Sequence, residues 1–203
     1  MNKQILIPAS SLTTPDTVVF LELSVEPDAE RDPYRALGAP GLEGAEATAR
    51  LALNSLPPAE PPARVRVAAD GSGKALTNYS GAALAMTLGP LLLQPGFTYH
   101  HYLIMGGLLM PEAGNTRLRP GQIKVSGVRD LPSKLQAIIN RGYRVEPALL
   151  LLAEEGCDGE VEPLLRALAP PNIAVRRIET LETAYQACGG PLPPARDDTH
   201  GLG

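Results

Sequence analysis

The sequence predicts an α+β fold class, with a strand-rich first half and a second half in which helices and strands alternate. Three patterns support this class. Short runs of β-branched and apolar residues occupy the first half of the chain. Apolar residues recur at helical spacing in several longer segments. From residue 131 onward the two patterns follow one another in turn, and no internal repeat is visible.

The predicted strands of the first half are apolar runs that end at proline or glycine. They are Ile5–Ile7, Thr17–Val25, Arg64–Ala68 and Tyr99–Met105. We expect Pro8 to end the first of them, because proline has no N–H to donate to a sheet. Asp28–Gly44 is polar and rich in turn residues, which predicts a loop. A hairpin is predicted where Leu108–Met110 and Gln122–Val128 flank a turn.

Helices are predicted from spacing and from the residues that end them. Ala45–Leu56 has apolar residues at helical spacing and is followed by Pro57, whereas Gly81–Leu93 is apolar almost all round and should be buried. A helix that begins at Leu131 has one apolar face and ends at Gly142. The remaining predicted elements are the strand Ala148–Ala153, the helix Glu160–Ala169, the strand Ile173–Ile178 and the helix Leu181–Cys188.

The length of 203 residues suits one domain with a tail. We expect the domain to comprise residues 1–190. Residues 191–203 are polar and rich in proline, which predicts a disordered C-terminal tail.

Charge and hydropathy exclude two classes of function. The net charge is −4, and the arginines occur as isolated pairs rather than as the basic stripe typical of nucleic-acid binding. No apolar run reaches the roughly 18–20 residues of a membrane span, and the N-terminus has no signal-peptide pattern. Cys157 and Cys188 have neither zinc-site spacing nor a disulfide framework, so we expect two thiols in a reducing compartment. The sequence therefore predicts a cytoplasmic protein that binds neither nucleic acid nor membranes.

Two short motifs are weak evidence for a phosphate or metal site. Gly71–Lys74 (GSGK) is similar to part of a phosphate-binding loop, but Ala68 and Ala75 stand where that loop needs a glycine and a hydroxyl. A flexible loop is therefore the preferred interpretation. His100 and His101 are neighbours in a predicted strand, so their rings point to opposite faces and cannot chelate one ion. We expect no metal and no cofactor.

Ser80 lies where a loop turns into the predicted small-residue helix. One interpretation is an N-cap, in which the hydroxyl accepts a hydrogen bond from a backbone N–H two or three residues later. The other is a nucleophile at the positive end of the helix dipole, with backbone N–H groups nearby to hold an oxyanion. The sequence leaves both interpretations open.

A nucleophilic serine needs a base, and the lysines are candidates because there are few of them, at positions 3, 74, 124 and 134. Lys134 flanks the apolar stripe formed by Leu131, Leu135 and Ile138 on its predicted helix. A lysine in apolar surroundings loses solvation of its charged form, so its pKa falls and the neutral amine can deprotonate a serine. The alternative is a surface lysine whose alkyl chain covers the stripe.

Two motifs, in this order, resemble those of the proteolytic domain of Lon proteases. The family's nucleophile motif reads G-P-S-A-G followed by small apolar residues, and Asn78–Met86 (NYSGAALAM) resembles it. The family's lysine motif reads G-G-L-K-E-K-L-x-A-A-x-x-x-G, and Arg129–Gly142 (RDLPSKLQAIINRG) resembles it, with Lys134 on the catalytic lysine. The order of the surrounding elements is similar over residues 17–188. The resemblance implies the Lon proteolytic-domain fold, in which helices pack on mixed sheets as in a ribosomal-protein second domain.

The resemblance also implies a catalytic dyad of Ser80 and Lys134. The residues that it implies for the oxyanion site and for support are Tyr79, Gly81, Met105 and Gly106. The chain departs from the family pattern in several places. Tyr79 replaces proline, and the Ala-Gly after the serine is reversed as Gly81-Ala82. Met105 replaces a threonine that supports the lysine, Gly107 replaces an acidic residue, and Leu108–Val128 is longer than the family hairpin. For such a dyad we expect a buried Lys134 whose Nζ lies within hydrogen-bond reach of Ser80 Oγ.

The activity implied by the resemblance is that of a serine endopeptidase that cleaves unfolded or extended polypeptides, with no ATPase module and no cofactor. Its implied partners are a polypeptide substrate and further copies of the chain, for which a ring is one arrangement; a separate ATPase is a partner to test. The alternative is a catalytically inactive Lon-fold protein that serves as a binding or scaffold module. A third class, small-molecule kinases that share this fold, is disfavoured because Thr77–Ala83 lacks the glycine density of their phosphate loop.

Overall fold

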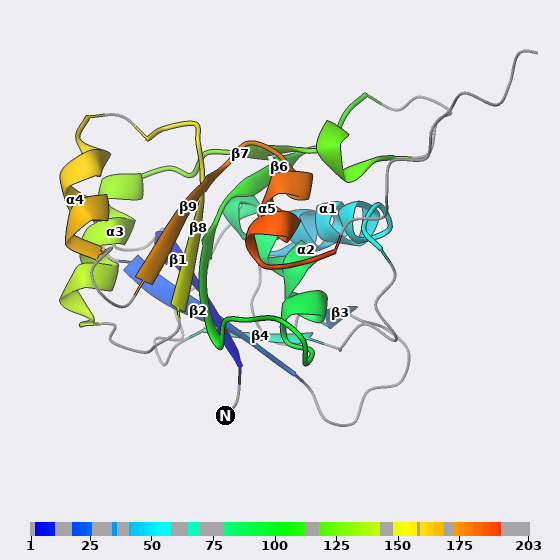
Figure 1. Ribbon diagram of the computed structural model, residues 1–203, viewed down its shortest axis with the longest axis horizontal. Coiled ribbons are helices and arrows are strands. Elements are labelled where there is room, and N and C mark those ends of the chain that lie inside the picture. Colours follow the sequence, from blue (N-terminus) through cyan, green and yellow to red (C-terminus); the bar gives the residue numbers. More distant parts are fainter. Residues whose placement is uncertain are drawn as a thin grey trace, which may run out of the picture.

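The structure is a computed structural model that describes residues 3–10, 18–25, 34–35, 41–57, 65–69, 79–112, 118–142, 148–157, 159–168 and 173–191. Within these residues the chain forms a mixed sheet, a two-stranded sheet and packed helices, which confirms the α+β class (Figure 1). The GSGK loop and nearly all of the predicted tail lie outside the described residues.

The larger sheet has seven strands in the order β3-β4-β2-β1-β5-β8-β9. Its strands are β1 (Gln4–Ser10), β2 (Val18–Val25), β3 (Tyr34–Arg35), β4 (Val65–Ala69), β5 (His101–Met105), β8 (Ala148–Ala153) and β9 (Ile173–Ile178). β2 pairs antiparallel with both β1 and β4, whereas β1, β5, β8 and β9 run parallel to their neighbours in that half of the sheet. A separate antiparallel pair is formed by β6 (Gly107–Leu109) and β7 (Lys124–Ser126).

The helices divide between the two faces of the parallel half of the sheet. They are α1 (Glu43–Leu53), α2 (Ala83–Leu92), α3 (Leu131–Asn140), α4 (Val161–Leu168) and α5 (Leu181–Ala187), with short 3₁₀ helices η1 (Ser80–Ala82) and η2 (Pro120–Gln122). Figure 1 shows α3 and α4 together on one side and α1, α2 and α5 on the other. Two hydrophobic cores result, one on each face.

Alternation along the central strands supplies both cores. In β5, Tyr102 and Ile104 face the core of α1, α2 and α5, whereas Leu103 and Met105 face the core of α3 and α4. All six residues of β8 are buried and alternate in the same way. Such apolar runs are typical of parallel strands that are covered on both faces.

Two sequence predictions are corrected by the strands. Pro8 does not end β1, which continues to Ser10. The reason is the register: among the described residues the pairing of β5 with β1 ends at Leu6, so no ladder bond with β5 needs an N–H at Pro8. The second correction concerns the predicted loop Asp28–Gly44, which contains the two-residue strand β3 paired with β4. The predictions for β8 and β9 match the observed bounds.

The segment that contains Ser80 also differs from its prediction. Residues 80–82 form η1, and the α-helix α2 begins only at Ala83. α2 is buried along its whole length, as predicted, and holds Pro90 within it. No helix among the described residues has both the length and the apolar character needed to cross a membrane.

Candidate active site

The site is built where the first turn of α3 meets the C-terminal end of β1. Asp130 precedes α3 with a left-handed backbone, φ 54° and ψ 39°, and Lys134 N donates to Asp130 O to close the first turn. The carboxylate of Asp130 accepts a hydrogen bond from Ser10 Oγ at 3.3 Å, at the end of β1. Positive φ is uncommon for residues other than glycine, and aspartate is among those that tolerate it. These contacts fix the start of the helix that carries Lys134.

Lys134 is the buried charged residue of the described chain, with 1% of its surface exposed. Side chains in a helix point back towards its N-terminus, and Nζ accordingly reaches the carbonyl oxygen of Arg129 at 2.6 Å. Burial lowers the pKa of Lys134 to about 8, and the nearby Asp130 carboxylate opposes that effect. The side chain is therefore a buried amine that is readily deprotonated, rather than a lysine lying along the surface.

Tyr79 lies against this amine. Lys134 Nζ is 5.3 Å from the centre of the Tyr79 ring, within the range of a cation–π contact. The phenol donates to Pro8 O at 2.6 Å, and burial raises the pKa of Tyr79, which keeps that donor protonated. The ring also packs on the backbone of η1, because a Cβ placed on Gly81 would lie 3.2 Å from Tyr79 Cζ. Tyr79 thus connects β1, η1 and α3.

Ser80 is exposed at the start of η1. It is not an N-cap: Tyr79 precedes η1, Ala82 precedes α2, and neither helix start has a side-chain capping bond. The Ser80 hydroxyl is therefore not used to cap either helix. The expected contact with the base is not formed, since the described hydrogen bonds of Lys134 Nζ go to Arg129 O and not to Ser80 Oγ. Tyr79 is the neighbour of Ser80 in the chain and its ring contacts Lys134, but Ser80 and Lys134 are not joined by a hydrogen bond.

The residues expected to support an oxyanion fall into different environments. The N–H of Tyr79 donates to Gly41 O at 2.8 Å, and the N–H of Gly106 donates to Gly81 O at 3.3 Å, so both amides already have acceptors. Met105 is fully buried in the core beneath α3 and α4. Gly81 is the member of the set that lies in η1 beside Ser80.

One neighbour of the site, Ser126, was not singled out from the sequence. Gly107 opposes Ser126 across the β6–β7 pair, and a Cβ on Gly107 would lie 2.4 Å from Ser126 Oγ and 3.4 Å from Ser80 O. Glycine at position 107 therefore makes room for a second hydroxyl close to the Ser80 backbone. The signal available in the sequence was this glycine at a position where the Lon motif has an acid; the pairing with Ser126 needed the strand register.

Other polar groups considered in the sequence lie away from this site or do not form a cluster. His100 and His101 are half-buried, and the Nδ1 atom of each has no hydrogen-bond partner. Within the part of the chain that the structure describes, no three histidine, cysteine or acidic side chains are placed to hold a metal ion. Cys188 is buried, which raises the pKa of its thiol to about 12, and Cys157 is a half-buried thiol that donates to Ala153 O at 3.2 Å.

The chain matches no model of a known protein family, and no curated protein is significantly similar to it in sequence. The chemistry of the site must therefore be argued from its own residues.

These residues supply a basic amine, an exposed hydroxyl and a half-buried aromatic ring that contacts the amine. A neutral amine can accept the proton of an alcohol, and a deprotonated alcohol attacks an acyl carbon. The fixed groups are Lys134, held by burial and by Arg129 O, and Tyr79, held by Pro8 O. The group that is free to meet a substrate is Ser80.

Proposed function

We propose that the chain is a Lon-like serine endopeptidase that acts on unfolded or extended polypeptides, with Ser80 as nucleophile and Lys134 as base. The observation that carries the proposal is the buried Lys134, whose pKa is lowered to about 8. Its amine contacts the ring of Tyr79, and the exposed Ser80 follows Tyr79 in the chain. The motif order that resembles the Lon proteolytic domain, and a mixed sheet with helices on both faces, support it.

The proposed reaction begins with attack by Ser80 Oγ on a peptide carbonyl carbon. Lys134 Nζ takes the hydroxyl proton and then donates it to the departing amine, which leaves an acyl ester on Ser80; water then hydrolyses the ester. At pH 7 an amine with a pKa near 8 is neutral in about a tenth of the molecules, compared with far less than 1% for an ordinary lysine. Burial therefore makes Lys134 a usable base near neutral pH.

The reaction requires a change in the site, because Lys134 Nζ is bonded to Arg129 O rather than to Ser80 Oγ. Catalytic hydrogen bonds are often formed only when substrate is bound. Rotation of the Ser80 side chain and movement of the flexible lysine chain are the motions that would join the two groups. The backbone donor proposed for the oxyanion is Gly81, since the amides of Tyr79 and Gly106 have other acceptors.

A second candidate is an inactive Lon-fold protein that serves as a binding or scaffold module. The observation that favours it is the same pair of Lys134 contacts, with Arg129 O and with the Tyr79 ring, because they satisfy the amine without Ser80. In that case Lys134 would stabilise the loop before α3 and have no catalytic role.

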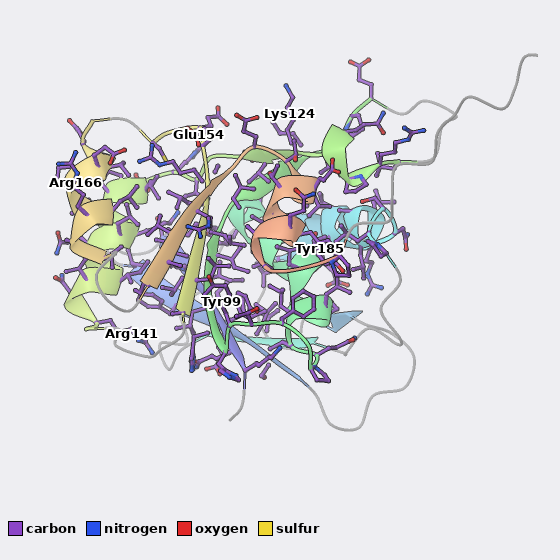
Figure 2. All side chains as sticks on the ribbon, viewed as in Figure 1. Tyr99, Lys124, Arg141, Glu154, Arg166 and Tyr185 are labelled. Atoms are coloured by element: carbon purple, nitrogen blue, oxygen red, sulfur yellow. The ribbon has the colours of Figure 1, made fainter. Side chains whose placement is uncertain are left out.

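Hydrolysis of casein and of fluorogenic peptides separates the two candidates. The proposal expects cleavage by the wild-type chain and its loss in Ser80→Ala and Lys134→Met. Matched controls are Ser133→Ala, an exposed serine beside Lys134, and Lys124→Met, an exposed lysine of β7 that Figure 2 shows on the outside of the molecule. Both controls should cleave at the wild-type rate. Cleavage by the Ser80→Ala protein at the wild-type rate would exclude the proposed nucleophile.

Labelling with an active-site-directed phosphonate gives a direct readout of the nucleophile. The adduct should be found by mass spectrometry on the peptide that contains Ser80, and labelling should be lost in Lys134→Met. No labelling and no cleavage across a broad peptide library would favour the inactive module, for which binding experiments with extended polypeptides then become decisive.

A further inference from the structure

Tyr79 lies at the junction between the serine segment and the lysine helix, and neither proposed role above explains it. Its ring is 5.3 Å from Lys134 Nζ, and it packs on Gly81, the residue after Ser80. Lys134 as a residue is 1% exposed, although Ser80, one residue from Tyr79, is exposed. A group must therefore cover the amine on the serine side, and the Tyr79 ring is placed to do so.

Both ends of Tyr79 are held. The phenol donates to Pro8 O at 2.6 Å, and the backbone N–H donates to Gly41 O at 2.8 Å. Pro8 belongs to the part of β1 that extends beyond β5, so its position is set by the sheet. The ring is thus held relative to α3 by its packing on Gly81 and by the backbone bond to Gly41 O, and the phenol bond to Pro8 O adds to them.

We propose that Tyr79 is a positioning residue for Lys134: its ring covers the amine and keeps it in the solvent-excluded place from which it can act as a base. The role of Lys134 as a base rests on the proposed function, whereas the contact by which Tyr79 covers the amine does not. The role also accounts for a departure from the Lon motif. Met105, at the position of the supporting threonine, is buried in the core and offers no hydroxyl, so support for the lysine comes from the serine side instead.

The ring acts on the amine in two opposing ways. Its face attracts the charged ammonium, which raises the pKa, while its bulk excludes water, which lowers the pKa. Burial lowers the pKa of Lys134 overall, and the Tyr79 ring is one of the groups that can exclude water from the amine. Asp130, at the start of α3, is the charged group of the described residues that acts on this amine, and it raises the pKa. The residues of β1 carry no charge, and the charged residues of the other elements packed on α3, Glu22 of β2 and Glu162 and Arg166 of α4, are not causes of the shift.

Because the two effects oppose each other, three substitutions distinguish them. Tyr79→Phe keeps the ring and loses only the bond to Pro8 O. Tyr79→Leu keeps apolar bulk but removes the ring face, so the Lys134 pKa should fall by about half a pH unit. Tyr79→Ala admits water, so the pKa should rise by about one pH unit or more towards the ordinary value. If Tyr79 only stabilised the fold, the two substitutions Tyr79→Leu and Tyr79→Ala would not shift the Lys134 pKa in opposite directions.

The measurement is a pH titration of the lysine side chains by NMR, on full-length protein labelled with ¹³C-lysine. The chain has few lysine signals, Lys134→Met assigns the one of interest, and exposed Lys124 is an internal control. The expected midpoint is about 8 for wild type, nearly the same for Tyr79→Phe, lower for Tyr79→Leu and higher for Tyr79→Ala. Lys124 should titrate identically in every variant.

Two results would overturn the inference. One is a wild-type Lys134 that titrates at the ordinary lysine value. The other is a Lys134 midpoint in Tyr79→Leu equal to that in Tyr79→Phe. Because this second comparison does not use Tyr79→Ala, it tests the inference even if Tyr79→Ala does not fold. The titration is independent of hydrolysis. Unchanged cleavage by Ser80→Ala would therefore reject the peptidase and leave the result on Tyr79 standing, whereas normal catalysis with an unmoved midpoint would reject only the role of Tyr79.

Discussion

Lys134 donates a hydrogen bond from Nζ to the carbonyl oxygen of Arg129 over 2.6 Å, five residues earlier in the chain and before its own helix begins. This bond lets the lysine lie inside the protein without an ion-pair partner within reach of a salt bridge among the described residues. One neutral carbonyl cannot replace the full hydration shell of an ammonium group. The buried lysine is therefore a cost to stability as well as a source of reactivity.

The first prediction concerns that cost. In the folded chain the pKa of Lys134 is about 8, and in the unfolded chain it is 10.5, so between these values the unfolded state binds more protons and stability rises with pH. Below pH 8 the full penalty of about 3 kcal/mol applies. Lys134→Met removes the penalty and loses a bond worth about 1 kcal/mol, so at pH 7 it should be about 2 kcal/mol more stable than wild type. Urea unfolding at pH 7 and pH 10 measures this, and the gain should disappear at the higher pH.

Lys124→Met is the matched control for this prediction, because Lys124 is exposed on β7. Its stability should follow that of the wild-type chain at both pH values. A Lys134→Met protein less stable than wild type at pH 7 would contradict the expected sign.

The second prediction is the pH dependence of hydrolysis. The reactive form has a neutral Lys134, so kcat/KM for a fluorogenic peptide should rise about tenfold between pH 7 and pH 9, with a midpoint near 8. The rise should reach a plateau, since more alkaline solution adds no further neutral amine. A rate that is constant or falls over this range is incompatible with Lys134 as the base.

The third prediction concerns the C-terminal end of α2. Lys3 Nζ donates to the carbonyl oxygens of Leu92, Gln94 and Phe97 and lies 5.5 Å from the centre of the Phe97 ring. A cation at this end satisfies carbonyl groups that the helix leaves unpaired and interacts favourably with the helix dipole. Lys3→Met should therefore destabilise the protein by about 2 kcal/mol. Thermal unfolding of Lys3→Met measures the loss, with Lys124→Met as the control. Equal melting temperatures of Lys3→Met and wild type would show that the contacts of Lys3 with these carbonyl groups do not stabilise the protein.

The fourth prediction uses the left-handed backbone of Asp130. Alanine at φ 54° pays a steric cost that glycine does not, so Asp130→Ala should be about 1 kcal/mol less stable than Asp130→Gly. Both variants lose the bond from Ser10 Oγ, so their difference isolates the backbone. Urea unfolding of the pair gives that difference directly, and equal stabilities would mean that the backbone relaxes to another conformation.

The predictable part of the fold is the part that depends on local pattern. The apolar runs of β8 and β9 gave their bounds, and the stripe of Leu131, Leu135 and Ile138 placed α3. What failed depended on neighbours far away in sequence. Pro8 stays within β1 because β5 does not reach it, and β3 exists because β4 pairs with it.

The candidate site divides in the same way. The sequence could place Lys134 on a helix flank but left its burial open, because burial needs Tyr79 and the core beneath α3. It placed Ser80 at a helix start but not in a separate 3₁₀ turn. The distance between the two groups depends on side-chain orientation across segments some fifty residues apart, and no periodic pattern specifies that.

The position of β1 in the sheet has a consequence for how the chain acquires its structure during synthesis. β1 is made well before β5, yet β5 is one of its two neighbours, with Gln4 opposite His101. At about 5–20 residues per second, a ribosome needs on the order of ten seconds to supply the later strand. Throughout that interval β1 can pair with β2 along one edge, while the other edge, which pairs with β5, has no partner strand. A nascent chain arrested before residue 101 should accordingly be bound by chaperones, and release should coincide with the appearance of β5.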